Sequence, residues 1–250
     1  MNYLLIFTIG LVIGSFLNVC IYRIPEEKSI VFPPSHCTQC KTSLKAIDLI
    51  PIISFIIYRG RCRYCGEKIS LQYPIVESMN GLMYVLLFMK FGFSIEFLQY
   101  ALLISGLIVI FMIDYYHQII PDGLNIFIFV LAMIFIGSKN LATHSFPLSN
   151  FLGLLVAGGF FLLIAVLTNG AMGGGDIKLM AALGFWFGLM EVILIIFLSF
   201  IIGGILSSML VLLRMKGRKD YIPFGPFIVI ATTIVTFFGK ELLQWYLSII

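Results

Sequence analysis

The chain is uncharged from Leu148 to Thr168, where it reads LSNFLGLLVAGGFFLLIAVLT. An α-helix rises about 1.5 Å per residue, so a run of this length crosses the ~30 Å hydrocarbon core of a bilayer. A helix pairs its own backbone hydrogen-bonding groups, as lipid requires. The stretch therefore predicts a transmembrane helix.

The whole chain has the same apolar character. Of its 250 residues 60% are hydrophobic and 11% are charged, and the mean hydropathy is +1.07. Soluble proteins have about 45–50% apolar and about 25% charged residues. A water-soluble globule, a disordered chain and a secreted disulfide scaffold are thereby excluded. The net charge of +4 would suggest a nucleic-acid partner in a soluble protein, but in a membrane protein it reports on topology, so we expect no nucleic acid.

Further stretches resemble the first one and predict an all-α polytopic membrane protein with about eight transmembrane helices. We expect a first helix at residues 1–22, a cytoplasmic loop domain at 23–68 and a seven-helix membrane domain at 69–250. The shortest helix is Ile177–Met190. The predicted helices are Met1–Tyr22, Ile69–Met89, Phe97–Ile113, Gly123–Ser138, Leu148–Thr168, Ile177–Met190, Val192–Leu213 and Tyr221–Gly239.

The basic residues are concentrated on one side of this topology. Thirteen of the 16 Lys and Arg residues fall in residues 23–68, at Lys178 or in residues 214–219. The positive-inside rule places that side in the cytoplasm, so both termini are expected outside a bacterial inner membrane. The first apolar stretch meets its first cation only at Arg23, which favours a retained helix over a cleaved signal peptide.

Four cysteines in the predicted loop domain have metal-ligand spacing. Cys37 and Cys40 form one Cys-x-x-Cys pair, Cys62 and Cys65 form another, and 21 residues separate the pairs. Two such turns can complete a tetrahedron of thiolates, and Gly66 suits the reversal of the second turn. Disulfides or free thiols are the alternative, but disulfides rarely persist in a reducing cytoplasm. We predict a structural Zn²⁺ that staples a loop too small to have its own core.

Carboxylates at the ends of apolar helices are the strongest functional signal. Glu77, Asp114, Asp122 and Asp176 all fall on the predicted cytoplasmic side, whereas Glu191 falls on the outer side. Acidic groups in a membrane are costly, and by default they serve a function. Asp122 follows Pro121, where a helix cap is the better interpretation.

Asp176 follows the triplet Gly173, Gly174 and Gly175. It could also be a simple helix cap, but three glycines cost more backbone entropy than a cap requires. Such a run would let an extended substrate approach the carboxylate, so we expect catalysis there, with Lys178 nearby.

Two aspartates at a low-dielectric boundary cannot both be ionised cheaply, so they would share a proton. The ionised member can activate water while the protonated member donates to the developing oxyanion. The sequence contains no Gly-x-Ser-x-Gly and no His-Glu-x-x-His motif. An acid-protease mechanism on Asp114 and Asp176 is therefore favoured over serine or metallo mechanisms.

Six motifs in this order resemble the bacterial type IV prepilin peptidases, which are membrane aspartic proteases with a Gly-x-Gly-Asp motif. The resemblance runs through nearly the whole chain. The motifs are Gly14-Ser-Phe-Leu-Asn18-Val, the two Cys-x-x-Cys pairs, Tyr73-Pro74-Ile-Val-Glu77, the block from Asp114 to Pro121-Asp122, Gly173-Gly-Gly175-Asp176-Ile-Lys178-Leu, and Pro223-Phe-Gly225-Pro226.

The resemblance implies that Asp114 and Asp176 are the catalytic pair and that Asp122 is an accompanying motif residue. It implies removal of the short basic leader of type IV prepilin or pseudopilin precursors, after a glycine, on the cytoplasmic side. It also implies methylation of the new amino terminus with S-adenosylmethionine. Gly14, Asn18 and Glu77 are candidates for that second activity.

Other classes of protein use some of the same features. A proton- or ion-coupled transporter would also carry membrane aspartates and broken, glycine-rich helices. A membrane scaffold with a zinc loop would not need the aspartates, and a different Gly-x-Gly-Asp protease would lack the zinc loop. The acids gather at one membrane edge rather than near the midplane, which favours the peptidase.

Overall fold

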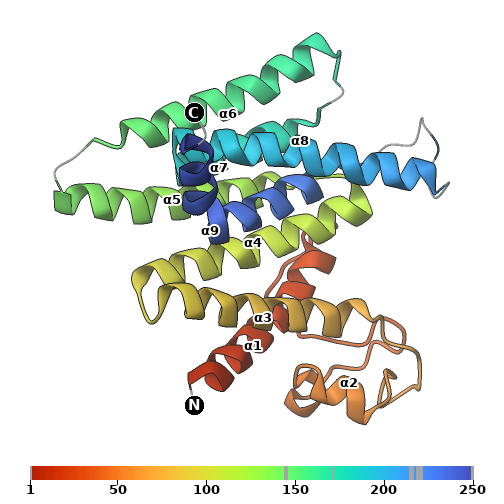
Figure 1. Ribbon diagram of the computed structural model, residues 1–250. Coiled ribbons are helices and arrows are strands. Elements are labelled where there is room, and N and C mark those ends of the chain that lie inside the picture. Colours follow the sequence, from red (N-terminus) through yellow and green to blue (C-terminus); the bar gives the residue numbers. More distant parts are fainter. Residues whose placement is uncertain (1, 144–145, 171, 214–216, 218–221, 249–250) are drawn as a thin grey trace. The chain divides into compact units, whose positions relative to one another are not determined.

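A computed structural model describes residues 2–143, 146–170, 172–213, 217 and 222–248. All of its long elements are α-helices, and the only β pairing among the described residues is two isolated bridges (Figure 1). The chain divides into two compact units, residues 1–109 and 110–250. The expectation of an all-α membrane protein is confirmed.

Each predicted transmembrane stretch corresponds to one helix. The helices run further than expected where polar residues continue a helical pattern: α4 passes Asp114, and α9 passes Gly239. Arg214, Lys216, Arg218, Lys219 and the predicted start at Tyr221 lie outside the described residues. The bounds are α1 Asn2–Arg23, α3 Gln72–Phe91, α4 Ile95–His117, α5 Asp122–Thr143, α6 Leu148–Leu167, α7 Gly174–Phe187, α8 Leu189–Leu212 and α9 Gly225–Leu247.

Six helices of the described chain are long and apolar enough to cross a membrane, namely α1, α4, α5, α6, α8 and α9. Helix α3 is less apolar because Glu77 and Lys90 lie within it. Helix α7 has 14 residues, which gives a length of only about 21 Å. The predicted number of eight spans is therefore not established, although all eight helices form.

In the first unit α1 packs against α3 through small residues. A Cβ at Gly10 would lie 2.7 Å from the Cα of Gly81, so the two backbones pass in direct contact. Lipid gives no hydrophobic drive for two helices to associate, and close contact between small residues supplies van der Waals attraction instead. Asn80 adds a buried hydrogen bond from its Nδ2 to the Gly10 carbonyl, 2.7 Å long.

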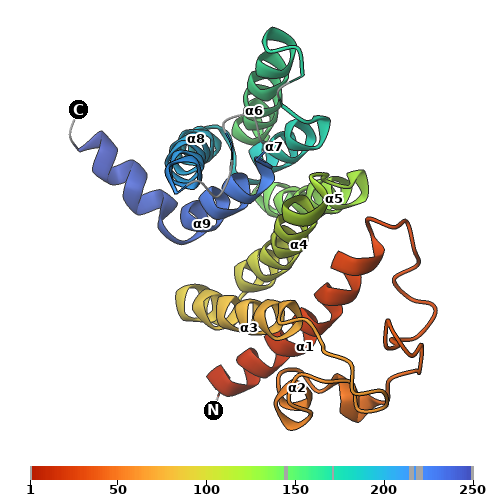
Figure 2. The same ribbon diagram turned by 90° about the vertical axis from the view of Figure 1, so that its right-hand side faces the viewer.

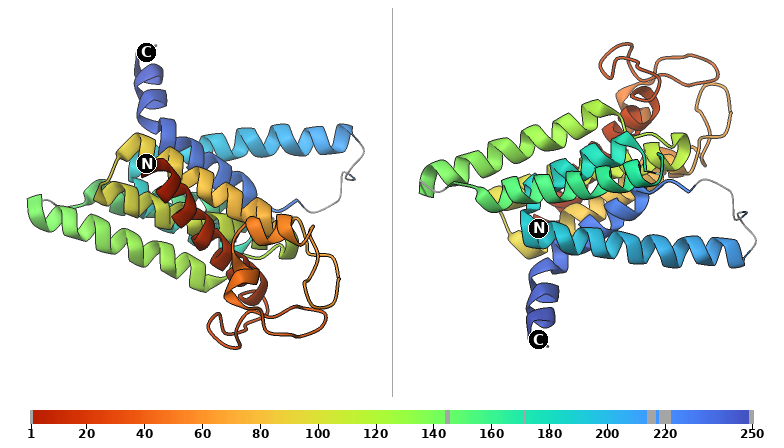
Figure 3. Two further views of the ribbon diagram at one scale, coloured as in Figure 1. Left: turned by 90° about the horizontal axis from the view of Figure 1, so that it is seen from below. Right: turned by 90° about the horizontal axis from the view of Figure 1, so that it is seen from above.

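The loop between α1 and α3 lies beyond the C-terminal end of α1 (Figure 3). It contains a 3-10 helix, η1 (Ala46–Leu49), and a short helix, α2 (Ile53–Ile57). At the start of this loop the buried side chain of Arg23 donates hydrogen bonds to the carbonyls of Ser29 and Pro33. The apolar stretch 47–58 is too short to cross a bilayer. Most of its isoleucines are exposed, with Ile56 at 68%, which suits a place in the membrane interface rather than in a protein core.

The second unit is built around the short helix α7, which contacts α5, α6 and α8 (Figure 2). Its apolar side chains are buried, including Leu179, Met180 and Leu183. Helix α6 crosses α7 where Gly153 meets Gly184, and a Cβ on either glycine would collide with the other backbone. Helix α8 also packs against α6 and α9.

Candidate active site and metal centre

Two buried aspartates come together within the second unit. Asp114 lies in the last turns of α4 and is 4% exposed, and Asp176 lies in the first turn of α7 and is 5% exposed. The charge on Asp114 acts on the Asp176 carboxylate. The structure thus brings together two side chains that lie 62 positions apart in the sequence.

Asp114 is held by the start of α9. The backbone N–H of Gly225 donates to its Oδ2 at 2.9 Å. Gly225 is the first residue of α9, so this N–H is one of the donors that a helix cannot satisfy internally. A Cβ at position 225 would lie 2.5 Å from Oδ2 and 3.0 Å from Cγ of Asp114. Only glycine permits this approach, which gives the Pro223-Phe-Gly225-Pro226 motif a role that its sequence did not reveal.

Asp176 is the third residue of α7, and Gly173 is the N-cap. The backbone of Gly173 hydrogen-bonds the Asp176 carboxylate, as the acidic residue of a capping box does. Asp176 is therefore not the N-cap, which was the alternative interpretation of the sequence. Its Oδ1 is buried with no hydrogen-bond partner among the described residues.

The three glycines before Asp176 differ in their surroundings. A Cβ at Gly175 would lie 2.8 Å from the Cβ of Ile120, so this glycine serves packing within the chain. A Cβ at Gly173 would lie 3.1 Å from Oδ2 of Asp176. Gly174 faces open space. A second backbone could therefore approach Gly174 closely. At Gly175 that space is already filled by Ile120 of the same chain.

Asp122 and Lys178 form an ion pair beside this centre. Lys178 Nζ contacts both oxygens of Asp122 at 2.7 Å, and both side chains are more than half exposed. The pair joins the first turn of α5 to the second turn of α7. An exposed pair stabilises a protein by little.

Sequence reasoning missed Asn125, a buried side chain one turn into α5. Its Nδ2 donates to the carbonyl of Gly175, the residue before Asp176, at 3.3 Å. The available signal was an amide in an otherwise apolar helix, three residues after Asp122.

In the first unit the four cysteines form a cluster of metal-ligand size. All four Sγ atoms lie within 4.8 Å of one another, and Cys37 and Cys65 are 3.9 Å apart. Zn–S bonds of about 2.3 Å in a tetrahedron require S···S distances of nearly this size. The residues therefore fit a metal ion. The neighbouring residue His36 contacts the carbonyl of Pro34 through its Nδ1.

The two cysteine pairs repeat one backbone pattern 25 positions apart. Cys37 N–H donates to Thr42 O and Lys41 N–H to Cys37 O, while Cys62 N–H donates to Glu67 O and Gly66 N–H to Cys62 O. Each turn closes with an isolated β bridge, His36 to Ser43 and Arg61 to Lys68. Lys41 and Gly66 both have positive φ, 58° and 75°. The reversal expected at Gly66 is present, and Lys41 makes the same turn without being glycine.

This backbone arrangement favours the thiolate at two of the four cysteines. Hydrogen bonds from the side chain and backbone of Thr42 lower the pKa of the Cys40 thiol to about 6. Backbone N–H groups of Cys65 and Tyr64 lower the pKa of Cys62. Desolvation and hydrogen bonds with the other three cysteines raise the pKa of the Cys65 thiol to about 11. Thiolates are the form that binds metal, so the turns favour that form at Cys40 and Cys62.

The candidates for the second activity also lie together in the first unit. A Cβ at Gly14 would be 2.7 Å from the Cα of Glu77. Asn18 donates to the Tyr73 carbonyl at 3.2 Å. Buried Glu77 accepts a hydrogen bond from the backbone of Ile52 at 2.8 Å, which ties the loop to α3.

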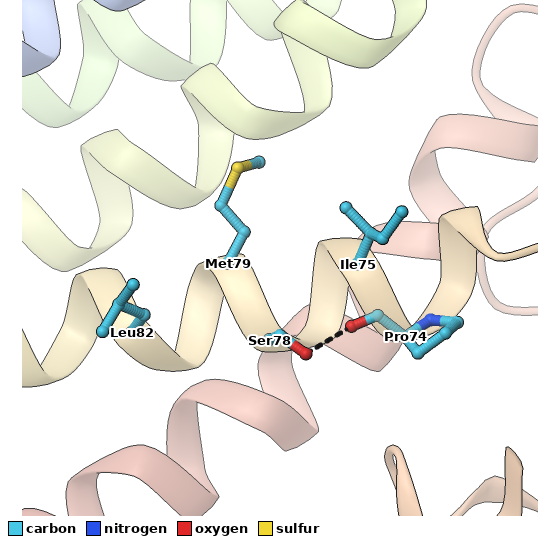
Figure 4. A pocket seen from close by; sticks show the side chains of 5 residues that line it. All are labelled: Pro74, Ile75, Ser78, Met79 and Leu82. Carbon is cyan, nitrogen blue, oxygen red and sulfur yellow. Dashed lines mark hydrogen bonds between the residues drawn. The ribbon is translucent and has the colours of Figure 1, made fainter. Parts of the chain in front are cut away.

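One face of α3 carries an apolar groove of about 430 Å³ (Figure 4). It is lined by Pro74, Ile75, Ser78, Met79 and Leu82, and the Ser78 hydroxyl donates to the Pro74 carbonyl. These side chains include no titratable group. The groove therefore offers apolar contact rather than chemistry.

Fold and site together define a class: an all-helical polytopic membrane protein with a buried carboxylate pair and a four-cysteine module. Comparison with family models is more specific. Residues 8–91 match the bacterial peptidase A24 N-terminal domain, and residues 101–208 match the type IV leader peptidase family. The chain belongs to the type IV leader peptidase family and is a membrane peptidase.

Relatives cover almost the full length. Proteins named prepilin leader peptidase/N-methyltransferase are 33% identical in Bacillus subtilis and 32% in Legionella pneumophila, each over 98% of this chain and over 97% and 94% of the relative. A relative of the same name in Neisseria gonorrhoeae is 34% identical over 91% of this chain and 87% of its own length. No solved structure matches. These findings give the transporter alternative no support.

Proposed function

We propose that this protein removes the basic leader of type IV prepilin or pseudopilin precursors after a glycine and then methylates the new amino terminus. The names of the full-length relatives support both activities. The cut is made at the cytoplasmic face of the bacterial inner membrane, with both termini outside. The uneven distribution of Lys and Arg supports that orientation.

Asp114 and Asp176 are the catalytic pair of the proposal. The observation that carries it is the juxtaposition of two buried, electrostatically interacting carboxylates from α4 and α7. Two such groups in a low-dielectric site share one proton. The ionised carboxylate takes a proton from the attacking water, and the protonated one donates to the carbonyl oxygen. The roles then reverse as the leaving amine is protonated.

The substrate approaches from the side on which Asp122, Lys178, Gly173, Gly174 and Gly175 lie. The cations of the leader are drawn to the exposed carboxylate of Asp122, in competition with Lys178. Open space at Gly174 admits the extended segment that is to be cut. The apolar helix after the cut remains in lipid.

Methyl transfer is assigned to the first unit, with Gly14, Asn18 and Glu77 holding S-adenosylmethionine or the new amine. S-adenosylmethionine supplies a methyl group on a sulfonium centre, which the free amine can attack. The clustering of the three residues supports this assignment. A carboxylate at Glu77 favours a bound cation of either kind.

Zn²⁺ is the metal proposed for Cys37, Cys40, Cys62 and Cys65. Four thiolates fill a tetrahedral shell and leave no position for water, so the role is structural. The ion stabilises a loop that has few buried side chains of its own.

The test measures cleavage of a purified precursor in detergent. Asp114→Asn and Asp176→Asn should each lower the rate by about 10²- to 10⁴-fold, because each removes a proton-transfer group. Glu96→Gln is the matched control, since Glu96 is an exposed carboxylate at the other end of α4. Equal insertion of all variants into membranes is verified first. Processing near the wild-type rate in both aspartate variants would refute the pair.

A further inference from the structure

We propose that Asn125 is a substrate-binding residue of the peptidase, whose Oδ1 accepts a hydrogen bond from a backbone N–H of the precursor beside the scissile bond. The inference rests on the proposed function and adds a residue that none of the motifs includes.

The orientation of the Asn125 amide follows from its surroundings. Its Nδ2 faces the carbonyl oxygen of Gly175 at 3.3 Å. A carbonyl can only accept, so the NH₂ end of the amide must point toward it. The acceptor end, Oδ1, therefore points elsewhere.

The Oδ1 atom has an unmet hydrogen-bonding requirement. Asn125 is 4% exposed, and its Oδ1 is fully buried with no hydrogen-bond partner among the described residues. A buried polar atom left unpaired is destabilising, and native proteins retain few of them. Those that persist call for an explanation, and a site that receives a ligand is one.

The Asn125 amide lies next to the start of α7, where Asp176 is found. The two ends of one amide are a single carbon apart, and the NH₂ end already contacts the residue before Asp176. Asp176 Oδ1 is buried and unpaired in the same way. Asp176 and the amide that contacts its neighbour Gly175 thus each carry a buried acceptor without a partner among the described residues.

A substrate in this site has the complementary requirement. A peptide must be extended to be cut, and its N–H groups then lose the partners that a helix supplied. At the edge of a bilayer an unpaired N–H is costly, so the enzyme must offer acceptors, as a strand-like partner does in peptide recognition. Asn125 Oδ1 meets that need without carrying charge.

The first experiment separates binding from simple support of α7. Asn125→Ala removes both ends of the amide. Asn150→Ala is the matched control, because Asn150 Nδ2 donates to the Phe185 carbonyl at the other end of α7, at 2.7 Å. We expect kcat/KM to fall about fivefold to 150-fold for Asn125→Ala, the loss typical of one unpaired polar group, and to change less than twofold for Asn150→Ala. Equal losses in both variants would assign Asn125 to structure alone.

The second experiment detects the contact itself. Synthetic precursor peptides carry an ester in place of one amide, position by position around the cut, which deletes a single N–H. In the wild type one ester should lower kcat/KM about fivefold to 150-fold, and in Asn125→Ala the same ester should have no further effect. Fully additive losses at every position would overturn the proposal. If the alanine variant does not fold, Asn125→Leu, whose side chain is similar in volume to asparagine, is used in its place.

Failure of this inference differs from failure of the proposed function. Suppose that the ester effects are additive and that the two aspartate variants are inactive. The proposed peptidase function is then supported, and Asn125 does not bind the substrate. If the wild type does not cut the unmodified peptide, the proposed function itself is wrong.

Discussion

At the scale of single residues, the site depends on backbone groups that are free only because of where they lie in a helix. Gly225 has an unpaired N–H because it begins α9, and that N–H binds Asp114. Asp176 uses one oxygen at the start of α7 and leaves the other without a partner. Helix starts thus hold both carboxylates in place.

Gly225→Ala should therefore damage the site without unfolding the protein. The new Cβ would collide with the Asp114 carboxylate and displace it, and a misplacement of about 1 Å can reduce turnover about a hundredfold. Gly204→Ala in α8 is the control, because a Cβ there meets no atom within 4 Å. Precursor cleavage and thermal unfolding are measured together. Full activity in Gly225→Ala would show that Asp114 does not need this contact.

At the scale of elements, two short segments, α7 and the loop before α3, are stabilised differently from the long helices. Helix α7 is too short to span a bilayer, and its apolar residues are instead buried among α5, α6 and α8. The loop before α3 has almost no hydrophobic core. The two cysteine turns, with their repeated backbone hydrogen bonds, order it instead.

Removal of one thiolate should release the metal and loosen the loop. Purified protein should contain about one Zn²⁺ per chain, and Cys40→Ser should contain much less, because three thiolates bind more weakly than four. Protease should then cut residues 23–68 faster. Cys20→Ser is the control, since Cys20 is buried in α1 away from the cluster. The absence of zinc from protein prepared without chelator would contradict the assignment.

The exposed isoleucines of α2 should lie in the membrane interface. Ile56 and Ile57 are 68% and 66% exposed, and apolar side chains on a loop beside lipid gain by entering it. A tryptophan at position 56, with Trp186 and Trp245 changed to Phe, should be quenched by lipids with brominated chains. A tryptophan at exposed Glu67 on the second cysteine turn should not. Equal quenching at both positions would mean that α2 does not enter the bilayer.

At the scale of the whole molecule, the residues proposed for the two activities fall in different compact units. Residues 1–109 contain the cysteine cluster with Gly14, Asn18 and Glu77, and residues 110–250 contain both aspartates and Asn125. Separate units suit two consecutive reactions on one substrate.

The two activities should be separable. Methylation needs the amine that cleavage exposes, so Asp114→Asn should block it on full precursor and permit it on a peptide supplied already trimmed. Glu77→Gln should cleave normally and methylate poorly, because it loses a charge near a cationic donor or ammonium group. Mass spectrometry of the product amino terminus measures whether it has been cleaved and methylated. A fully methylated product from Glu77→Gln would remove Glu77 from the site.

The sequence by itself determined the class of protein, the places of the helices and most of the residues proposed to do chemistry. These follow from local causes: apolar runs long enough for lipid, cysteine spacing within a turn, and the rarity of carboxylates at helix ends. It also singled out Asp114 and Asp176, because an acidic group in apolar surroundings stands out without knowledge of its neighbours.

Only the tertiary structure decided which distant groups meet. Gly225 binds Asp114 across 111 positions, and Asn125 reaches Gly175 across 50. The short helix α7 forms inside a bundle where its length alone would not support a span. No local pattern encodes such contacts, because they arise from helix packing and from backbone atoms whose availability depends on where each helix begins.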